Sequence, residues 1–146
     1  MTRIDFYVLQ EGARLTREHL VCLLAHKAYD QGQSLYIHAS SREEVNTLDE
    51  LLWTFRDISF LPHQRIDEGL SPDAPIVIGC GEAPPETTKL MINLAHPPPP
   101  FVSQIDRIIE VVSQAPDIRQ QARERYRYYQ AQGYSLNTHA ITSYHE

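Results

Sequence analysis

Four short apolar runs are separated by segments of helical period, and this alternation constrains the fold more than any other feature of the sequence. The runs cover residues 4–9, 35–38, 75–78 and 90–94, and each has the length and the aliphatic content of a buried strand. Strands that alternate with helices favour a mainly parallel sheet with helices on its faces. We therefore predict a single α/β domain of Rossmann-like type over residues 1–146.

Cap residues predict where the first two helices begin and end. Thr16 is in position to cap the first helix, and Gly32 stands where a left-handed residue would end it. Ser40 and Glu43 have the spacing of a capping box at the start of a second helix. Apolar residues then recur at helical spacing as far as Phe55, so we expect the second helix to extend to that residue.

In the second half of the chain, four consecutive prolines at residues 97–100 exclude regular hydrogen-bonded structure. We predict two helices beyond them, at residues 102–113 and 116–132, with Gly133 ending the second. Residues 139–146 fall in no predicted element and are expected to form a flexible tail.

The size and composition are those of one ordinary globular domain. The chain has 146 residues, of which 42% are hydrophobic and 22% charged, and no apolar run approaches the roughly 20 residues that a membrane span requires. The first residues lack the apolar core of a signal peptide, which favours an intracellular, cytoplasmic location. Cys22 and Cys80 are the only cysteines, and we expect both to be reduced and Cys22 to be buried.

Motifs for nucleotide chemistry are missing from the sequence. After the first predicted strand, Gly12 is the single glycine where a dinucleotide-binding turn would have three, and there is no phosphate-binding loop. Residues 79–81 are interpreted as a plain turn after a strand. A nucleotide-binding or hydrolytic α/β enzyme with a site near Gln10, His38 and Gly79 stays open as an alternative, because such sites form at the ends of parallel strands.

One side of the first predicted helix carries His19, Cys22 and His26, whose imidazole and thiolate groups are common metal ligands. Their spacing matches no established zinc pattern, and no second cysteine–histidine pair lies nearby in the sequence. We predict neither a metal nor a cofactor.

The last predicted helix carries Arg119, Arg123 and Arg127 at four-residue spacing. Four residues is just over one helical turn, so these side chains are expected to form an arginine ridge along one side of the helix. Residues 116–132 contain four arginines, one aspartate and one glutamate, a net charge of +2, although the whole chain carries −6. A local basic surface on an acidic protein favours a short anionic partner over nucleic acid.

Tyr126 lies where the arginine ridge borders the apolar stripe of the same helix. An aromatic ring beside guanidinium groups can hold an apolar side chain while the guanidiniums bind carboxylates. Leu136, Asn137 and Thr138 are expected to fold back and form the other wall. The sequence therefore predicts a pocket for an acidic peptide that ends in a hydrophobic residue, the alternative being a surface helix whose arginines are only solvated.

A second candidate surface surrounds Trp53, the only tryptophan of the chain. Phe60, Leu61 and Pro62 follow it in a segment outside the helical pattern. Such a segment can cover the edge of a sheet, and it can also supply aromatic anchors for a partner protein. The residues alone leave both interpretations open.

Several segments together resemble the chi subunits of bacterial DNA polymerase III, and the similarity covers nearly the whole chain. The first half contributes Asp-Phe-Tyr-Val-Leu at residues 5–9, Leu-Asp-Glu-Leu-Leu-Trp at 48–53 and Ser-Phe-Leu-Pro-His at 59–63. The second half contributes Ala-Pro-Ile-Val-Ile at 74–78, Ala-Arg-Glu-Arg-Tyr at 122–126 and Leu-Asn-Thr at 136–138. The segment at 122–126 is the most specific of them.

The resemblance implies a non-catalytic accessory protein of DNA replication with a Rossmann-like fold. It implies as ligand the acidic C-terminal tail of the single-stranded-DNA-binding protein, in which aspartates are followed by Ile-Pro-Phe. The residues at the corresponding positions would form the tail site; they are Arg119, Arg123, Tyr126, Arg127, Leu136, Asn137 and Thr138.

The resemblance also assigns a role to the second candidate surface. Trp53, Phe60, Leu61 and Pro62 would lie where the family binds the psi subunit of the clamp loader, a position that a substitute for psi or a helicase could also take. DNA would be reached only through the coating protein, and no membrane is implied. Direct binding of DNA by the arginine ridge is a further alternative, which the net charge of −6 opposes.

Overall fold

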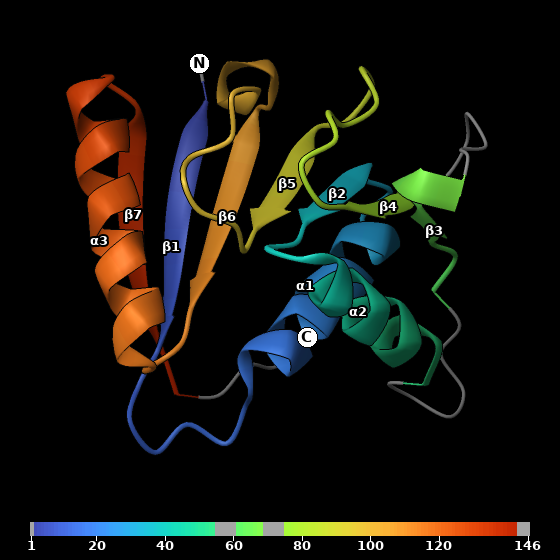
Figure 1. Ribbon diagram of the computed structural model, residues 1–146, viewed down its shortest axis with the longest axis horizontal. Coiled ribbons are helices and arrows are strands. Elements are labelled where there is room, and N and C mark those ends of the chain that lie inside the picture. The colour runs from blue at the N-terminus through green and yellow to red at the C-terminus, as the bar shows by residue number, and fades with distance from the viewer. Residues whose placement is uncertain (1, 55–60, 69–74, 143–146) are drawn as a thin grey trace.

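The computed structural model describes residues 2–54, 61–68 and 75–142. Within them, one seven-stranded sheet has the order β3-β4-β2-β5-β6-β1-β7, and every neighbouring pair of strands is parallel (Figure 1). The strands are β1 (Arg3–Leu9), β2 (Leu35–His38), β3 (Gln64–Arg65), β4 (Ile76–Gly79), β5 (Leu90–Asn93), β6 (Arg107–Val112) and β7 (Ser135–Ile141). The helices are α1 (Arg17–Asp30), α2 (Arg42–Thr54) and α3 (Pro116–Ala131), and η1 (Ile66–Glu68) and η2 (Val102–Gln104) are single 3-10 turns. The predicted α/β class and parallel sheet are confirmed.

Helices cover both faces of the sheet. On one face, α1 and α2 bury a cluster that includes Leu20, Leu48 and Ile37, and on the other face α3 buries a cluster that includes Phe6 and Tyr129. Figure 1 shows α3 beside β1 and β7, away from α1 and α2. Strands β2, β4 and β5 are buried along their whole length, which explains why they appear in the sequence as continuous apolar runs.

The helix ends follow the predicted caps, with one shift. Thr16 caps α1, because its side-chain oxygen accepts a hydrogen bond of 3.1 Å from the His19 backbone N–H, and Gly32 has φ 69° after the helix. The capping interaction of α2 lies one residue later than predicted. The Glu44 N–H donates to Ser41 Oγ (3.1 Å), while the Glu44 carboxylate accepts from the Ser40 backbone N–H (2.8 Å). Phe55, the predicted end of this helix, lies outside the described residues.

The helix predicted at residues 102–113 is wrong. After the short turn η2, this segment forms β6, which pairs with β5 and β1 in the middle of the sheet. Charged residues such as Arg107 and Glu110 ordinarily avoid a central strand, because burial removes their charge from water. Both side chains have partners within the fold, Asp5 for Arg107 and Arg125 for Glu110, so the β-branched run around them can occupy a central strand.

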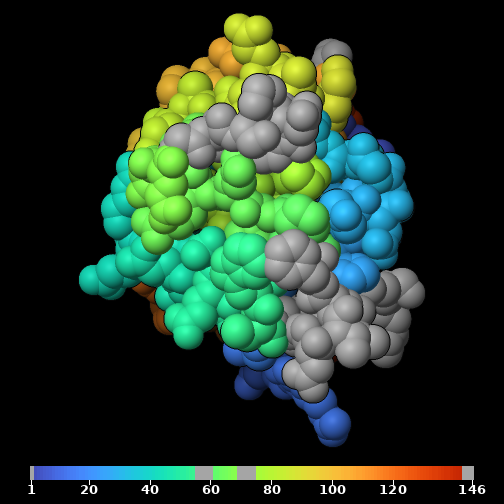
Figure 2. All heavy atoms as spheres, turned by 90° about the vertical axis from the view of Figure 1, so that its right-hand side faces the viewer, coloured from blue at the N-terminus to red at the C-terminus, as the bar shows by residue number. Residues whose placement is uncertain are grey.

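Besides β6, two further strands were missing from the predicted sheet. The short strand β3 forms one edge, and β7 forms the other. His139, Ala140 and Ile141, which we expected in a flexible tail, belong to β7 and pair with β1. Figure 2 shows the end of the molecule where α2, β3 and η1 form the surface.

Cys22 is buried, as predicted, and both cysteines are free. In the part of the chain that the structure describes, no helix has both the length and the apolar character needed to cross a membrane.

Candidate functional site

A pocket of about 170 Å³ lies between α3 and the sheet. Its walls come from β1, β6, β7 and α3, and the lining residues are Phe6, Val8, Val112, Arg119, Ala122, Arg123, Tyr126 and Thr138. Four of the seven residues predicted for the tail site are among them: Arg119, Arg123, Tyr126 and Thr138. A volume of this size accommodates one large side chain rather than a nucleotide.

The floor of the pocket is apolar because of strand alternation. Phe6 and Val8 are two residues apart on β1, so both side chains point to the α3 face. The ring of Phe6 lies 5.3 Å from that of Tyr126, centroid to centroid, in a tilted arrangement. Tyr126 is half-buried and therefore presents part of its ring to the pocket as well as to the core.

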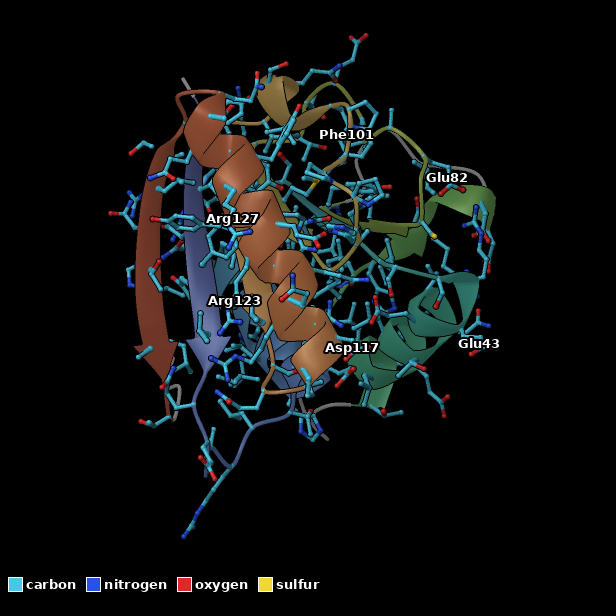
Figure 3. All side chains as sticks on the ribbon, turned by 60° about the vertical axis from the view of Figure 1, so that its left-hand side comes forward. Glu43, Glu82, Phe101, Asp117, Arg123 and Arg127 are labelled. Atoms are coloured by element: carbon cyan, nitrogen blue, oxygen red, sulfur yellow. The ribbon has the colours of Figure 1, made fainter. Side chains whose placement is uncertain are left out.

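The rim of the pocket is cationic. Arg119 and Arg123 line it from successive turns of α3, and in Figure 3 Arg127 extends from the same side of the helix as Arg123. Arg119 Nη1 donates a hydrogen bond of 3.2 Å to Gln114 Oε1, which holds that guanidinium at the pocket edge. Arg123 and Arg127 are exposed and form no ion pair with any residue in 2–54, 61–68 or 75–142, so their charges are available to a ligand.

Arg125, the fourth arginine of α3, is not part of this surface. It is only 2% exposed, and its guanidinium pairs with the buried carboxylate of Glu110, at 3.0 Å between Nη2 and Oε1. Glu124 in turn lies 3.1 Å from His96 Nε2. The net charge of +2 counted over the helix therefore includes a charge that is neutralised in the core, and the basic surface is formed by the three ridge arginines.

The three residues predicted for the opposite wall lie on β7 and do not share one face. Thr138 lines the pocket, and Leu136 packs against the same cluster as Phe6. Asn137 pairs in register with Asp5, whose carboxylate lies 3.4 Å from His139 Nε2 on the other face of the sheet. Strand alternation thus places the side chain of Asn137 away from the pocket.

The second candidate surface lies on the other side of the sheet, on α2 (Figure 2). Trp53 is 46% exposed, and its ring packs 4.5 Å from the ring of His63. Leu61 is buried and Pro62 is half-buried, while Phe60 lies outside the described residues. Among the predicted residues of this surface that the structure describes, Trp53 is therefore the one that presents a large apolar area to solvent.

The residues around the positions considered for an enzyme site make contacts within the protein. A second cavity, of about 450 Å³, lies at the carboxyl ends of β1 and β6 and includes Gln10, but Arg17 within it donates to the carbonyls of Val111 (3.2 Å) and Leu94 (2.8 Å). Gly79 has no room for a side chain because a Cβ would meet the Tyr36 hydroxyl and Ile66 Cγ2. Close packing thus explains why a glycine stands at position 79.

Two hydrogen bonds hold His38 in a single tautomer. His38 Nε2 accepts from the Gly81 N–H (3.1 Å), so Nδ1 carries the proton and donates to Asn93 Oδ1 (2.9 Å). Burial lowers the pKa of His38. No group of three or more metal-binding side chains occurs within the described ranges.

A family model described as DNA polymerase III chi subunit, HolC, matches residues 1–137. The chain belongs to this family. The chain is 40% identical to the DNA polymerase III subunit chi of Pseudomonas aeruginosa over 97% of its length and 98% of that protein's length. It is 32% identical to the subunit of the same name from Haemophilus influenzae, over 94% of this chain and 96% of that one. The corresponding Escherichia coli subunit is 28% identical over 94% and 97%.

The fold is also similar to that of a protein outside this family. The crystal structure of T4 UvsW superposes with a TM-score of 0.67 over 96% of this chain and 41% of that one, at 9% sequence identity. At this identity the similarity shows the α/β fold alone. Membership of the chi family makes the protein an accessory component of a replicative DNA polymerase, as its resemblance predicted.

The residues that form the floor of the pocket were not predicted from the sequence. Phe6, Val8, Val112 and Ala122 line it, and none was predicted as a site residue. Phe6 and Val8 alternate along an N-terminal run that was recognised as a strand, but alternation alone does not say which face a terminal helix covers. The missing information was the order of strands in the sheet.

Proposed function

We infer that this protein binds the acidic C-terminal tail of a single-stranded-DNA-binding protein in the pocket between α3 and the sheet. The observation that carries the proposal is the combination of an apolar floor with a rim of ridge arginines, two of which lack partners among the described residues. A peptide with aspartates followed by Ile-Pro-Phe matches both parts, because the terminal side chain fits the floor and the carboxylates pair with guanidinium groups.

The pocket contributes no chemistry beyond binding. Its polar groups are two arginines, the Tyr126 hydroxyl and the Thr138 hydroxyl, and this set offers hydrogen-bond donors for carboxylates without an activated nucleophile. The role proposed is therefore that of a non-catalytic adaptor.

The surface around Trp53 serves as the second attachment point. It lies on the α2 side of the sheet, so a partner there would leave the α3 pocket free. We assign to it the psi subunit of the clamp loader, or a protein that takes the place of psi, with Trp53 as the anchor and buried Leu61 as support beneath the surface. Joining the two partners raises the effective concentration of the polymerase near coated DNA.

The binding of a labelled peptide tests the tail site directly. Fluorescence anisotropy of Asp-Asp-Asp-Ile-Pro-Phe should show saturable binding that weakens between about 50 mM and about 300 mM salt, because exposed charge pairs are screened. A peptide with the terminal phenylalanine removed should bind much more weakly, since it leaves the apolar floor empty. Absence of saturable binding by the complete peptide at low salt would contradict the proposed tail site.

A further inference from the structure

Among the described residues, the outer edge of β7, beside the pocket, pairs with no strand. In the sheet of described residues, β7 is an outermost strand and pairs only with β1. It is seven residues long, whereas β3 at the opposite edge has two. Natural sheets commonly protect an edge with lysine, proline, a bulge or a very short strand. The β7 sequence Ser-Leu-Asn-Thr-His-Ala-Ile contains neither lysine nor proline, so this edge is open to a further strand.

The backbone groups that face outward can be identified from one hydrogen bond. The Gln10 N–H donates to the Ile141 carbonyl (2.9 Å), so the backbone of Ile141 faces β1. Successive residues of a strand direct their backbone groups to alternate sides. The residues whose N–H and C=O groups face away from β1 are therefore Leu136, Thr138 and Ala140.

The same three residues direct their side chains to the α3 face. Thr138 lines the pocket, and Leu136 and Ala140 are two residues away on either side, so they point the same way. A strand added at this edge would consequently place alternate side chains next to Thr138, which lines the same pocket as Arg119 and Arg123. The free backbone groups of β7 thus lie beside the pocket and its arginines.

We propose that the bound peptide adds to the sheet as an antiparallel strand along the outer edge of β7. In an antiparallel pair, residues opposite each other exchange both backbone hydrogen bonds and direct their side chains to the same face. The peptide residues that bond to Leu136, Thr138 or Ala140 therefore project toward the pocket and the arginine ridge. The inference rests on the proposed function, which supplies the acidic peptide, and adds to it the mode of recognition.

The proline of Asp-Asp-Asp-Ile-Pro-Phe fixes which peptide residues face β7. Proline has no N–H, so its backbone must point away from the edge. The flanking isoleucine and phenylalanine then face β7, the third aspartate points away, and the second aspartate faces β7 again. This alternation makes a prediction for the peptide that is independent of its side chains.

Backbone N-methylation tests that alternation. A methyl group on the nitrogen of the isoleucine or of the second aspartate should weaken binding by about three- to tenfold, the equivalent of one lost hydrogen bond. A methyl group on the third aspartate is the matched control and should leave the affinity within about twofold. Equal losses at all three positions, or none at any, would overturn the strand-addition mode.

Amide hydrogen exchange of the complete protein provides a second readout. With saturating peptide, the amides of Leu136, Thr138 and Ala140 should exchange more slowly, while those of Asn137 and His139, which already face β1, should change little. Saturable binding without this alternate protection overturns strand addition and leaves the tail site intact. Loss of binding altogether contradicts the proposed function instead. Protection of the three amides that appears without peptide and rises with protein concentration would show that a second copy occupies the edge, and would also overturn the proposal.

Discussion

Arg125 and Glu110 form an ion pair in the interior of the protein, with Arg125 Nη2 3.0 Å from Glu110 Oε1 and side-chain exposures of 3% and 0%. The second carboxylate oxygen of Glu110 accepts hydrogen bonds from the Tyr129 hydroxyl and from Asn93 Nδ2, both at 2.8 Å. Arg125 and Tyr129 of α3 thus both bind Glu110 of β6. Residues two apart on a helix point roughly 200° from each other, so turning Arg125 into the core turns Arg123 and Arg127 outward.

Replacing Arg125 should destabilise the fold far more than replacing a ridge arginine. Arg125→Met leaves the Glu110 carboxylate buried without its counter-charge, and we expect a loss of about 3–5 kcal/mol in the free energy of unfolding. Arg127→Met is the matched control, with an expected change within about 0.5 kcal/mol because Arg127 is exposed. Urea denaturation followed by circular dichroism measures both, and equal midpoints for the two variants would contradict the structural role of Arg125.

His38 should make stability depend on pH in the weakly acidic range. Burial lowers the pKa of His38 below its ordinary value of 6.5, so the unfolded chain takes up the proton first as pH falls. The contribution of His38 is complete above about pH 6.5 and is lost as pH drops through the lower pKa of the folded state. The melting temperature should therefore decrease between about pH 7.5 and about pH 5.5.

A His38→Gln variant provides the comparison for this pH effect. Glutamine has no titrating group, so the variant should be less stable at neutral pH but should lose less stability on acidification. A parallel decline in both proteins would assign the pH dependence to other groups.

Substitutions around the pocket should separate binding from folding. Arg123→Ala should weaken the binding of the acidic peptide by about 1.5–3 kcal/mol, the range for hydrogen bonds to charged groups, and leave the melting temperature nearly unchanged because the side chain is exposed. Asn137→Ala is the control on the same edge strand, since that side chain points to the other face. Peptide titration by anisotropy gives the affinities of the two variants. A larger effect of Asn137→Ala than of Arg123→Ala would place the peptide on the face of the sheet away from α3 and would contradict the proposed site.

The two surfaces should be separable by mutation. Trp53→Ala removes an exposed ring on α2 and should leave peptide affinity within about twofold, because the pocket lies beyond the sheet. The same change should cost about 2 kcal/mol or more in binding the clamp-loader partner, if Trp53 is its anchor. Titration with each partner in turn gives the two values, and a variant that loses peptide binding as well would show that the surfaces are coupled.

Much of the fold could be predicted because local signals agreed with tertiary structure. Thr16 and Gly32 mark the ends of α1 by their own hydrogen-bonding and conformational preferences, and both act as expected. The prediction for residues 102–113 failed because Glu110 can occupy a buried strand only when Arg125 and Tyr129 pair with its carboxylate. The local sequence does not show these partners.

The candidate site could also be predicted only in part. Helical periodicity correctly brought Arg119, Arg123 and Tyr126 to one pocket, because the spacing of a helix fixes which side chains share a side. It could not separate Arg125 from the ridge arginines by exposure, nor assign Asn137 to the opposite face, because both depend on how α3 and β7 dock on the sheet. Residues of the floor, such as Phe6, required the order of the strands.

Binding to coated DNA distinguishes recognition of the acidic tail from direct contact with DNA. Surface plasmon resonance would compare this protein on an immobilised single-stranded oligonucleotide saturated with the single-stranded-DNA-binding protein, on the same oligonucleotide coated by that protein without its acidic C-terminal residues, and on the bare oligonucleotide. We predict saturable binding to the first surface and none to the other two, with the Arg123→Ala variant weakened on the first. Equal binding to the tail-less coat would contradict the tail site, and binding to the bare oligonucleotide would show that the arginine ridge contacts DNA itself.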